Sequence, residues 1–189
     1  KATLEGHKGA VWDCMFGPEG QFLVSCSEDR SLKIWDLENV PVVSTTLRGG
    51  RWGHTGAVRG CAFSPNGAYI GSASHDGTVR LWDPKKSLGS NGLKACVQTW
   101  STHQGKNWTC EFSPDSTVLA AAGDDTVVRL FNIASGSLAF VLPHNSSVND
   151  LSFHSDSNDV LLTGSRDGKL RCWDWTNGQE LKPMEPLGR

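Results

Sequence analysis

Apolar and polar residues alternate along short stretches that recur through the chain. Alternation with a period of two is typical of half-buried β-strands, and no stretch shows the longer period of an amphipathic helix. Glycine, proline, serine, asparagine and aspartate cluster between these stretches, and such residues favour tight turns. The clearest alternating stretches are AVWDCMF, AVRGCAF, KNWTCEF and SVNDLSF, which begin at residues 10, 57, 106 and 147.

Each alternating stretch opens a unit with the same order of segments. It is followed by a turn such as SPNG, a second apolar strand such as AYIGSAS, a tight turn at an aspartate, and a third strand such as TVRLWD. A more variable fourth segment precedes the next unit. The pattern therefore predicts an all-β chain in which four short strands form one repeating unit.

Four histidines set the phase of this repeat. They lie 47, 49 and 41 residues apart, and an aromatic residue follows each of them after 28, 28, 28 and 29 residues. An aspartate stands six residues before each aromatic. This many coincidences in four copies indicate an internal repeat. The four sets are His7, Asp29 and Trp35; His54, Asp76 and Trp82; His103, Asp125 and Phe131; and His144, Asp167 and Trp173.

The sequence resembles the WD-repeat β-propeller family over nearly its whole length. The resemblance rests on the pairs Gly6-His7 and Gly53-His54 and on the Trp-Asp pairs that begin at Trp35, Trp82 and Trp173. Members of the family fold into four-stranded antiparallel blades around a central axis. The resemblance implies an all-β propeller with repeats at approximately 4–46, 47–97, 98–139 and 140–181, and with 182–189 as a last strand or a tail.

Four repeats are few for this family, whose rings usually close with about seven blades. An incomplete ring leaves sheets without a neighbour at both ends, which is an aggregation hazard. We therefore expect the four blades to belong to a larger ring of about seven blades, completed by further blades from the same or another chain. A closed ring of four blades is the alternative.

The recurring histidine, aspartate and tryptophan are better explained as structural than as catalytic residues. A catalytic triad occurs once, whereas this set occurs in every repeat. In the family these residues hydrogen-bond inside the blade, through a strand hydroxyl that could come here from Ser25 or Ser27, Ser72 or Ser74, and Thr163 or Ser165. The resemblance assigns this structural network to His7, Asp29, Trp35, His54, Asp76, Trp82, His103, Asp125, His144, Asp167 and Trp173.

The third repeat departs from this set. Phe131 replaces the tryptophan and removes its N–H donor, while Ala121 and Gly123 stand where other repeats carry hydroxyl groups. A buried polar group without a partner costs about 1–3 kcal/mol, so members of the network should be lost together. We expect packing to hold this blade, and we expect it to be the least stable of the four.

Composition and charge argue against several classes of function. The chain has 18 basic and 20 acidic residues and a net charge of −2, so it lacks the basic excess of a protein that coats nucleic acid. No apolar run approaches the roughly 18 residues of a transmembrane helix. Six cysteines in 189 residues are too few for a disulfide scaffold, and no Cys-x-x-Cys pair suggests a metal site. We expect no nucleic-acid or membrane partner and no metal or other cofactor.

The start of the sequence shows no charged segment followed by an apolar one, as a secretory leader would have. We therefore expect an intracellular location, cytoplasmic or nuclear, the cilium and the cytoskeleton included.

Two positions of each repeat carry residues that do not suit a buried core. They are the residue five after each histidine and the residue before each repeat aspartate. In the family's geometry both lie at the end of the blade where its innermost strand begins, which we call the histidine face. Tryptophan and arginine are enriched in interface hot spots. We expect a partner surface formed by Trp12, Arg59, Trp108, Asn149, Glu28, His75, Asp124 and Arg166; the alternative is that the tryptophans pack against neighbouring loops.

The stretch TLRGGRWGH lengthens the approach to the second histidine. Leu4 precedes His7 by three residues, whereas Leu47 precedes His54 by seven, which indicates an insertion of four residues. A single RGG lacks the repetition of an RNA-binding tract, and its glycines suit a longer turn. We expect the insertion to enlarge the partner surface with Arg48, Arg51 and Trp52.

The sequence predicts a non-catalytic scaffold or adaptor that binds protein or peptide partners within a larger complex. No unrepeated pair of nucleophile and base and no phosphate-binding loop suggests an enzyme. One alternative is a reader of modified peptides, in which Arg59, His75 and Arg166 would bind a phosphate group, or Trp12 and Trp108 would enclose a methylated lysine. Another is a substrate receptor of a ubiquitin ligase, whose Trp-Asp-x-Arg motif is missing from WDLE, WDPK and WDWT.

Overall fold

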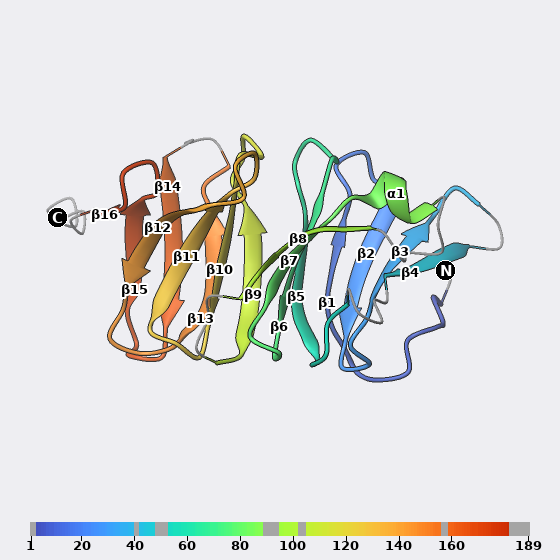
Figure 1. The fold of residues 1–189 in the computed structure, drawn as a ribbon, viewed down its shortest axis with the longest axis horizontal. Helices are drawn as coiled ribbons and strands as arrows, with labels where there is room; N and C mark the ends of the chain where they lie inside the picture. Colours follow the sequence, from blue (N-terminus) through green and yellow to red (C-terminus); the bar gives the residue numbers. More distant parts are fainter. Residues whose placement is uncertain are drawn as a thin grey trace, which may run out of the picture.

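The computed structural model describes residues 3–39, 42–47, 53–88, 95–101, 105–155 and 159–181. Within these ranges the strands form four antiparallel sheets of four strands each. The strands of each sheet follow one another in chain order, so sequence neighbours are also neighbours in space. The sheets stand beside each other as blades 1 to 4 (Figure 1). The expected all-β propeller architecture is confirmed.

Each blade consists of four short strands. Blade 1 contains β1 (Val11–Phe16), β2 (Phe22–Ser27), β3 (Leu32–Asp36) and β4 (Val43–Leu47). Blade 2 contains β5 (Val58–Phe63), β6 (Ile70–Ser74), β7 (Val79–Trp82) and β8 (Cys96–Trp100). Blade 3 contains β9 (Asn107–Phe112), β10 (Val118–Gly123), β11 (Val127–Asn132) and β12 (Leu138–Pro143). Blade 4 contains β13 (Val148–Phe153), β14 (Val160–Ser165), β15 (Leu170–Asp174) and β16 (Gln179–Glu180).

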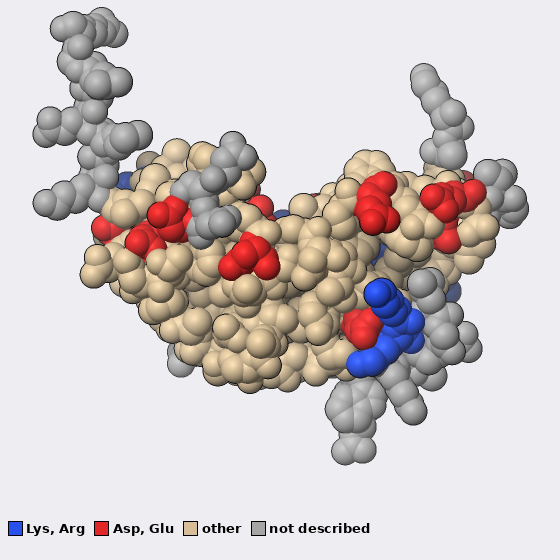
Figure 2. All heavy atoms as spheres, turned by 90° about the horizontal axis from the view of Figure 1, so that it is seen from above, with Lys and Arg blue, Asp and Glu red and all other residues tan. Residues whose placement is uncertain are grey.

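The first strand of each blade joins it to the next blade. β1 contacts β5, β5 contacts β9, and β9 contacts β13. Seen from the end of the blades where these strands finish, the four blades form an open crescent (Figure 2). The opposite end, where the first strands begin, is the histidine face.

One short helix, α1 (Pro84–Leu88), follows β7 in the part of the chain that is described. The alternation pattern did not predict it, because a single turn is too short to show a helical period. Two local features explain it: proline suits the first position of a helix, and the Asp83 carboxylate accepts the amide N–H of Lys85 at 2.9 Å. The helix lies at the end of the blades opposite the histidine face (Figure 1). We call this end the helix face.

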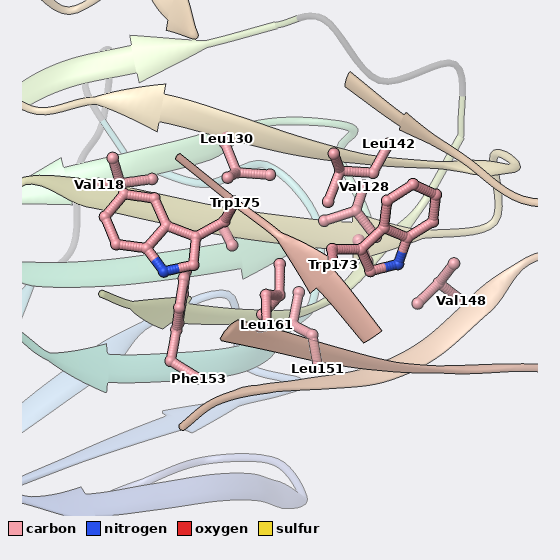
Figure 3. Close-up of a cluster of buried hydrophobic side chains, with 12 residues drawn as sticks. Val118, Val128, Leu130, Leu142, Val148, Leu151, Phe153, Leu161, Trp173 and Trp175 are labelled. Carbon is pink, nitrogen blue, oxygen red and sulfur yellow. The ribbon is translucent and has the colours of Figure 1, made fainter. Parts of the chain in front are cut away.

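The hydrophobic core is divided among the spaces between neighbouring blades. In each space, apolar residues from the second and third strands of one blade meet a phenylalanine and an aromatic marker residue of the next. Between blades 3 and 4, Leu130 packs with Phe153, Leu161 and Trp173 (Figure 3). Each such side chain contributes about 1.5–3 kcal/mol when fully buried, so neighbouring blades stabilise one another.

The positions that meet between blades are exposed on the two terminal blades. The repeat phenylalanines of blades 2 to 4 are at most 8% exposed, whereas Phe16 of blade 1 is 63% exposed. At the other end, Leu170 of blade 4 is 73% exposed, while Leu32 at the same repeat position of blade 1 is fully buried. Both terminal blades therefore present an apolar face of the kind that packs between blades elsewhere.

Candidate partner-binding site

In blade 2, one hydroxyl group joins the repeat histidine to the repeat tryptophan. The indole N–H of Trp82 donates to Oγ of Ser72 at 2.8 Å, and Ser72 Oγ lies 2.7 Å from Nε2 of His54. Nδ1 of His54 lies 2.9 Å from a carboxylate oxygen of Asp76. These bonds fit a neutral ring protonated on Nδ1. Burial lowers the pKa of His54 although Asp76 opposes the shift, which agrees with a neutral ring.

Blade 1 repeats this arrangement with the same residue types. Trp35 donates to Ser25 at 2.8 Å, Ser25 lies 2.8 Å from Nε2 of His7, and Nδ1 of His7 lies 3.0 Å from Asp29. Among the serines that the sequence left open, Ser25 and Ser72 therefore take the central position.

Blade 4 keeps only half of the network. Trp173 donates to Oγ1 of Thr163 at 3.0 Å, and Thr163 lies 2.8 Å from Nε2 of His144. Nδ1 of His144 meets the carbonyl oxygen of Leu142 at 3.1 Å, and Asp167 accepts a hydrogen bond from Arg171 at 2.6 Å. The prediction of a bond between His144 and Asp167 is therefore wrong. The histidine binds a backbone carbonyl oxygen instead, and the aspartate binds an arginine.

Blade 3 replaces the network by stacking and an ion pair. Phe131 lies against Trp100 of β8 with ring centroids 4.7 Å apart and planes 20° apart. The Trp100 indole N–H donates to the carbonyl oxygen of Gly136 at 2.7 Å. Asp125 pairs with Arg129, as Asp167 does with its own arginine. His103, the remaining expected member, lies outside the described residues.

In blades 1 and 2 the network also fixes the loop that precedes the first strand. In blade 2 the carboxylate of Asp76 accepts the amide N–H of Thr55 at 2.8 Å, in addition to its bond with His54. Burial would raise the pKa of Asp76, but the hydrogen bonds from His54, Thr78 and Thr55 hold it well below its usual value. The ionised carboxylate thereby ties the loop to the turn before the third strand.

One backbone hydrogen bond places the expected partner-binding positions at the same end of all four blades. The amide N–H of the residue before each repeat aspartate donates to the carbonyl oxygen two residues before the other variable position. The four bonds measure 2.8 to 2.9 Å and run from Glu28 to Ala10, from His75 to Ala57, from Asp124 to Lys106, and from Arg166 to Ser147. The eight positions therefore border the histidine face.

A β-bulge occurs at the same point of each first strand. In every blade the pairing of the first strand with the second shifts by one residue there, and the residue left over is the variable one. A bulge redirects the side chain of its extra residue and is common beside functional sites. The four extra residues are Trp12, Arg59, Trp108 and Asn149.

Two arginines lie over two tryptophans across neighbouring blades. The Arg59 guanidinium carbon is 4.0 Å from the centre of a Trp12 ring, and that of Arg166 is 4.2 Å from a Trp108 ring. Nε of Arg166 also donates to the side-chain oxygen of Asn149 at 3.2 Å. A contact between a guanidinium group and an aromatic ring contributes about 0.5–1 kcal/mol at exposed sites. Five of the eight expected residues are thus brought into two groups, one on blades 1 and 2 and one on blades 3 and 4.

His75 lies in a field of mixed charge on this face. Burial lowers its pKa, and Lys106 and Arg59 lower it further, while Asp124 and Glu28 act in the opposite direction. Lys106 was not among the expected site residues, because its position carries alanine or serine in the other repeats. Arg48, Arg51 and Trp52 of the four-residue insertion lie outside the described residues.

Comparison with known families gives a match to all four repeats. A model of the family described as "WD domain, G-beta repeat" matches residues 1–36, 44–83, 94–132 and 136–174. Among solved structures, one described as "Structure of U3-55K" superposes with a TM-score of 0.82 over 94% of this chain and 53% of that chain, at 22% sequence identity. At this identity the likeness concerns the fold alone.

Curated relatives match over single-repeat lengths. The probable cytosolic iron-sulfur protein assembly protein Ciao1 of Drosophila mojavensis is 46% identical over 35 residues, which cover 18% of this chain and 11% of the relative. The probable cytosolic iron-sulfur protein assembly protein CIAO1 homolog of Schistosoma japonicum is 46% identical over 39 residues, 21% of this chain and 11% of the relative. The matches thus span about a tenth of these relatives.

Among the described residues, no helix has the length and apolar character needed to cross a bilayer.

Proposed function

Because the chain belongs to the WD-repeat family, whose propellers generally serve as scaffolds for protein interactions, we propose that it is a non-catalytic scaffold. In this proposal its histidine face binds a protein or peptide partner within a larger complex. The contact residues with the strongest support are Trp12 and Arg59 on one side and Trp108 and Arg166 on the other.

The two cross-blade tryptophan–arginine pairs carry this proposal. Trp12 is 45% exposed although a neighbouring arginine covers one of its ring systems. An exposed aromatic ring held in place by a second blade offers contact area that loses little entropy on binding. Tryptophan and arginine are also the side chains that most often dominate interface energies. In blades 1 and 2 the repeat aspartates bind the amide N–H groups of the loops beside this face, which ties these loops to their blades.

Loss of both tryptophans tests the proposal. The double variant Trp12→Ala, Trp108→Ala should lose a defined set of partners in affinity capture followed by quantitative mass spectrometry. A matched variant, Val97→Ala, changes an exposed apolar residue on β8 instead and should keep those partners. Circular dichroism and thermal unfolding would establish that both variants are folded. Partners retained by a folded double variant would refute the proposed surface.

The geometry favours anionic over methylated ligands if the face reads a modified peptide. A methylammonium group needs open aromatic ring faces, but a guanidinium group already covers a ring of Trp12 and of Trp108. A stacked guanidinium keeps its in-plane N–H donors for a carboxylate or phosphate. A phosphoserine peptide array should therefore give stronger binding than a trimethyl-lysine array, and Arg59→Gln with Arg166→Gln should remove the difference.

Further blades are proposed to cover the open faces of blades 1 and 4. Phe16 and Leu170 are exposed at positions that are buried wherever a neighbouring blade is present. The superposition covers 53% of a longer solved chain, which is compatible with four blades being about half of a ring. Analytical ultracentrifugation of this 189-residue chain should show self-association, and a chain with additional blades should not associate through these faces. A monodisperse monomer of the four blades would contradict this.

The curated relatives support the repeat type more than a pathway, because each match is about one repeat long. We propose an intracellular location for this chain, which agrees with the word "cytosolic" in the names of those relatives. Microscopy of the tagged full-length protein would test it.

A further inference from the structure

The helix face carries a pocket of about 350 Å³ between blades 1 and 2. Its apolar lining includes Phe22 and Ile34 of blade 1 and Phe63 and Pro84 of blade 2. This volume falls within the range of about 300–1,000 Å³ that is usual for ligand pockets. The pocket lies at the opposite end of the blades from the tryptophan–arginine pairs.

The internal repeat explains why this space is open. The corresponding space between blades 3 and 4 is lined by Val118, Leu130 and Phe153, the repeat equivalents of Phe22, Ile34 and Phe63. There the side chain of Trp175 fills the centre, as Figure 3 shows. Trp175 is only 6% exposed and meets Phe153 edge to face, with ring centroids 5.6 Å apart.

Proline replaces the filling residue in blade 2. Two residues after the marker aromatic, blade 4 has Trp175, blade 3 has Ile133 and blade 2 has Pro84. Ile133 packs against the cluster between blades 2 and 3. Its backbone N–H donates to the carbonyl oxygen of Thr117 at 2.9 Å, and that of Trp175 donates to the carbonyl oxygen of Asp159 at 3.0 Å. Both acceptors stand directly before the second strand of their blade. Proline has no N–H to make this bond and has a smaller side chain. The chain turns into α1 instead, and no other side chain in the described ranges fills the space.

The rim of the pocket adds a direction to the site. Lys85, the second residue of α1, lines one part of it, and Glu19 of the β1–β2 turn lines another. Figure 2 shows basic side chains gathered on this face at the position of α1. A ligand with a carboxylate on its α1 side would meet attraction from Lys85, and one with the carboxylate on the other side would meet repulsion from Glu19.

We propose that this pocket binds a peptide segment of a partner protein through a tryptophan side chain with an acidic residue beside it. The indole would take the place that Trp175 occupies between blades 3 and 4, with its ring edge-to-face on Phe63. Buried aromatic anchors of this kind commonly dominate peptide and protein interfaces. The site is separate from the histidine face and gives the scaffold a second point of attachment.

Short peptides containing 5-fluorotryptophan provide the test. The probe is N-acetyl-fluorotryptophan-Asp-Asp amide, and its binding is followed by ¹⁹F line width and shift as the protein is added. Saturable binding is expected. Pro84→Trp, which supplies the missing side chain from within, should weaken it at least about tenfold. Lys85→Glu should weaken it about threefold, whereas Lys169→Glu, an equal charge change in the β14–β15 turn, should not.

Three results would overturn the proposal. The first is equal competition by unlabelled peptides with tryptophan and with alanine at the anchor position. The second is undiminished binding to a folded Pro84→Trp protein. The third is loss of binding in the Trp12→Ala, Trp108→Ala protein, which would place the peptide on the histidine face. If only the histidine-face proposal fails, peptide binding at Pro84 remains.

Discussion

Replacing Ser72 with alanine should remove the central hydrogen-bonding group of blade 2. Ser72 is fully buried, accepts the indole N–H of Trp82 at 2.8 Å and lies 2.7 Å from Nε2 of His54. The substitution leaves two buried polar groups without that partner, and each costs about 1–3 kcal/mol. We therefore expect a loss of about 2–4 kcal/mol, which is large against the roughly 5–15 kcal/mol that stabilises a typical domain.

Blade 3 shows how such a loss can be offset. It carries Ala121 and Phe131 at the positions of Ser72 and Trp82, so the hydroxyl and the indole N–H are absent together. The double variant Ser72→Ala, Trp82→Phe should therefore lose less free energy of unfolding than the sum of the two single variants. The phenylalanine removes the indole N–H, which has no acceptor once Ser72 is alanine. The expected coupling energy is about 1–2 kcal/mol, within the usual range for residues in direct contact.

Urea unfolding followed by far-ultraviolet circular dichroism measures all four proteins of this cycle. Circular dichroism is preferred because tryptophan fluorescence would change with Trp82→Phe itself. Thr163→Ser in blade 4 is the control, since it keeps the hydroxyl that Trp173 and His144 share and removes only a methyl group. Costs that add within about 0.5 kcal/mol would show that Ser72 and Trp82 act independently and would refute the reasoning.

Further outcomes follow from other parts of the structure. Burial raises the pKa of Glu111 to about 7, so the stability gained from its protonated form is present below about pH 4.5 and is lost as pH rises through 7. Glu111→Gln should therefore gain about 1–2 kcal/mol relative to the parent between pH 5 and 8, after allowance for its partial exposure; an equal urea-midpoint difference at both pH values would contradict this. Hydrogen exchange should be faster in the strands of blade 3 than in those of blade 2, the other blade with a neighbour on each side, and equal protection of these two blades would disprove that. Phe16→Ser with Leu170→Ser should reduce self-association in ultracentrifugation, and unchanged association would place the contact elsewhere.

The fold could be predicted from the sequence because the same strand pattern and the same spacing of histidine, aspartate and aromatic residue occur four times. One alternating strand could be confused with part of a buried helix, but four copies with a histidine and an aromatic in fixed register could not. The helix α1 was missed for the converse reason. It occurs once, is a single turn long, and depends on the local pair of Asp83 and Pro84.

The candidate site could be predicted only in part. The repeat register placed the variable positions at one end of the blades, but it did not show that Arg59 would reach Trp12 or that Arg166 would reach Trp108. Those contacts depend on β-bulges and on the spacing of neighbouring blades, which leave no mark in a single repeat. The break between His144 and Asp167 was equally hidden. Its competing partner, Arg171, has an equivalent in Arg80 of blade 2, where the bond between His54 and Asp76 is kept.

Departures from the repeat divide into those compensated within the chain and those that are not. In blade 3, Phe131 replaces the marker tryptophan and stacks on the ring of Trp100. In blade 4, Asp167 has no bond with His144 but accepts a hydrogen bond from Arg171. Both departures therefore leave a packed and hydrogen-bonded blade. Pro84 leaves a pocket that none of the described side chains fills. A compensated departure needs no partner to explain it, whereas an unfilled apolar space costs stability unless something occupies it. The uncompensated position is therefore the better guide to a binding function, and it is the one we propose to test with a tryptophan peptide.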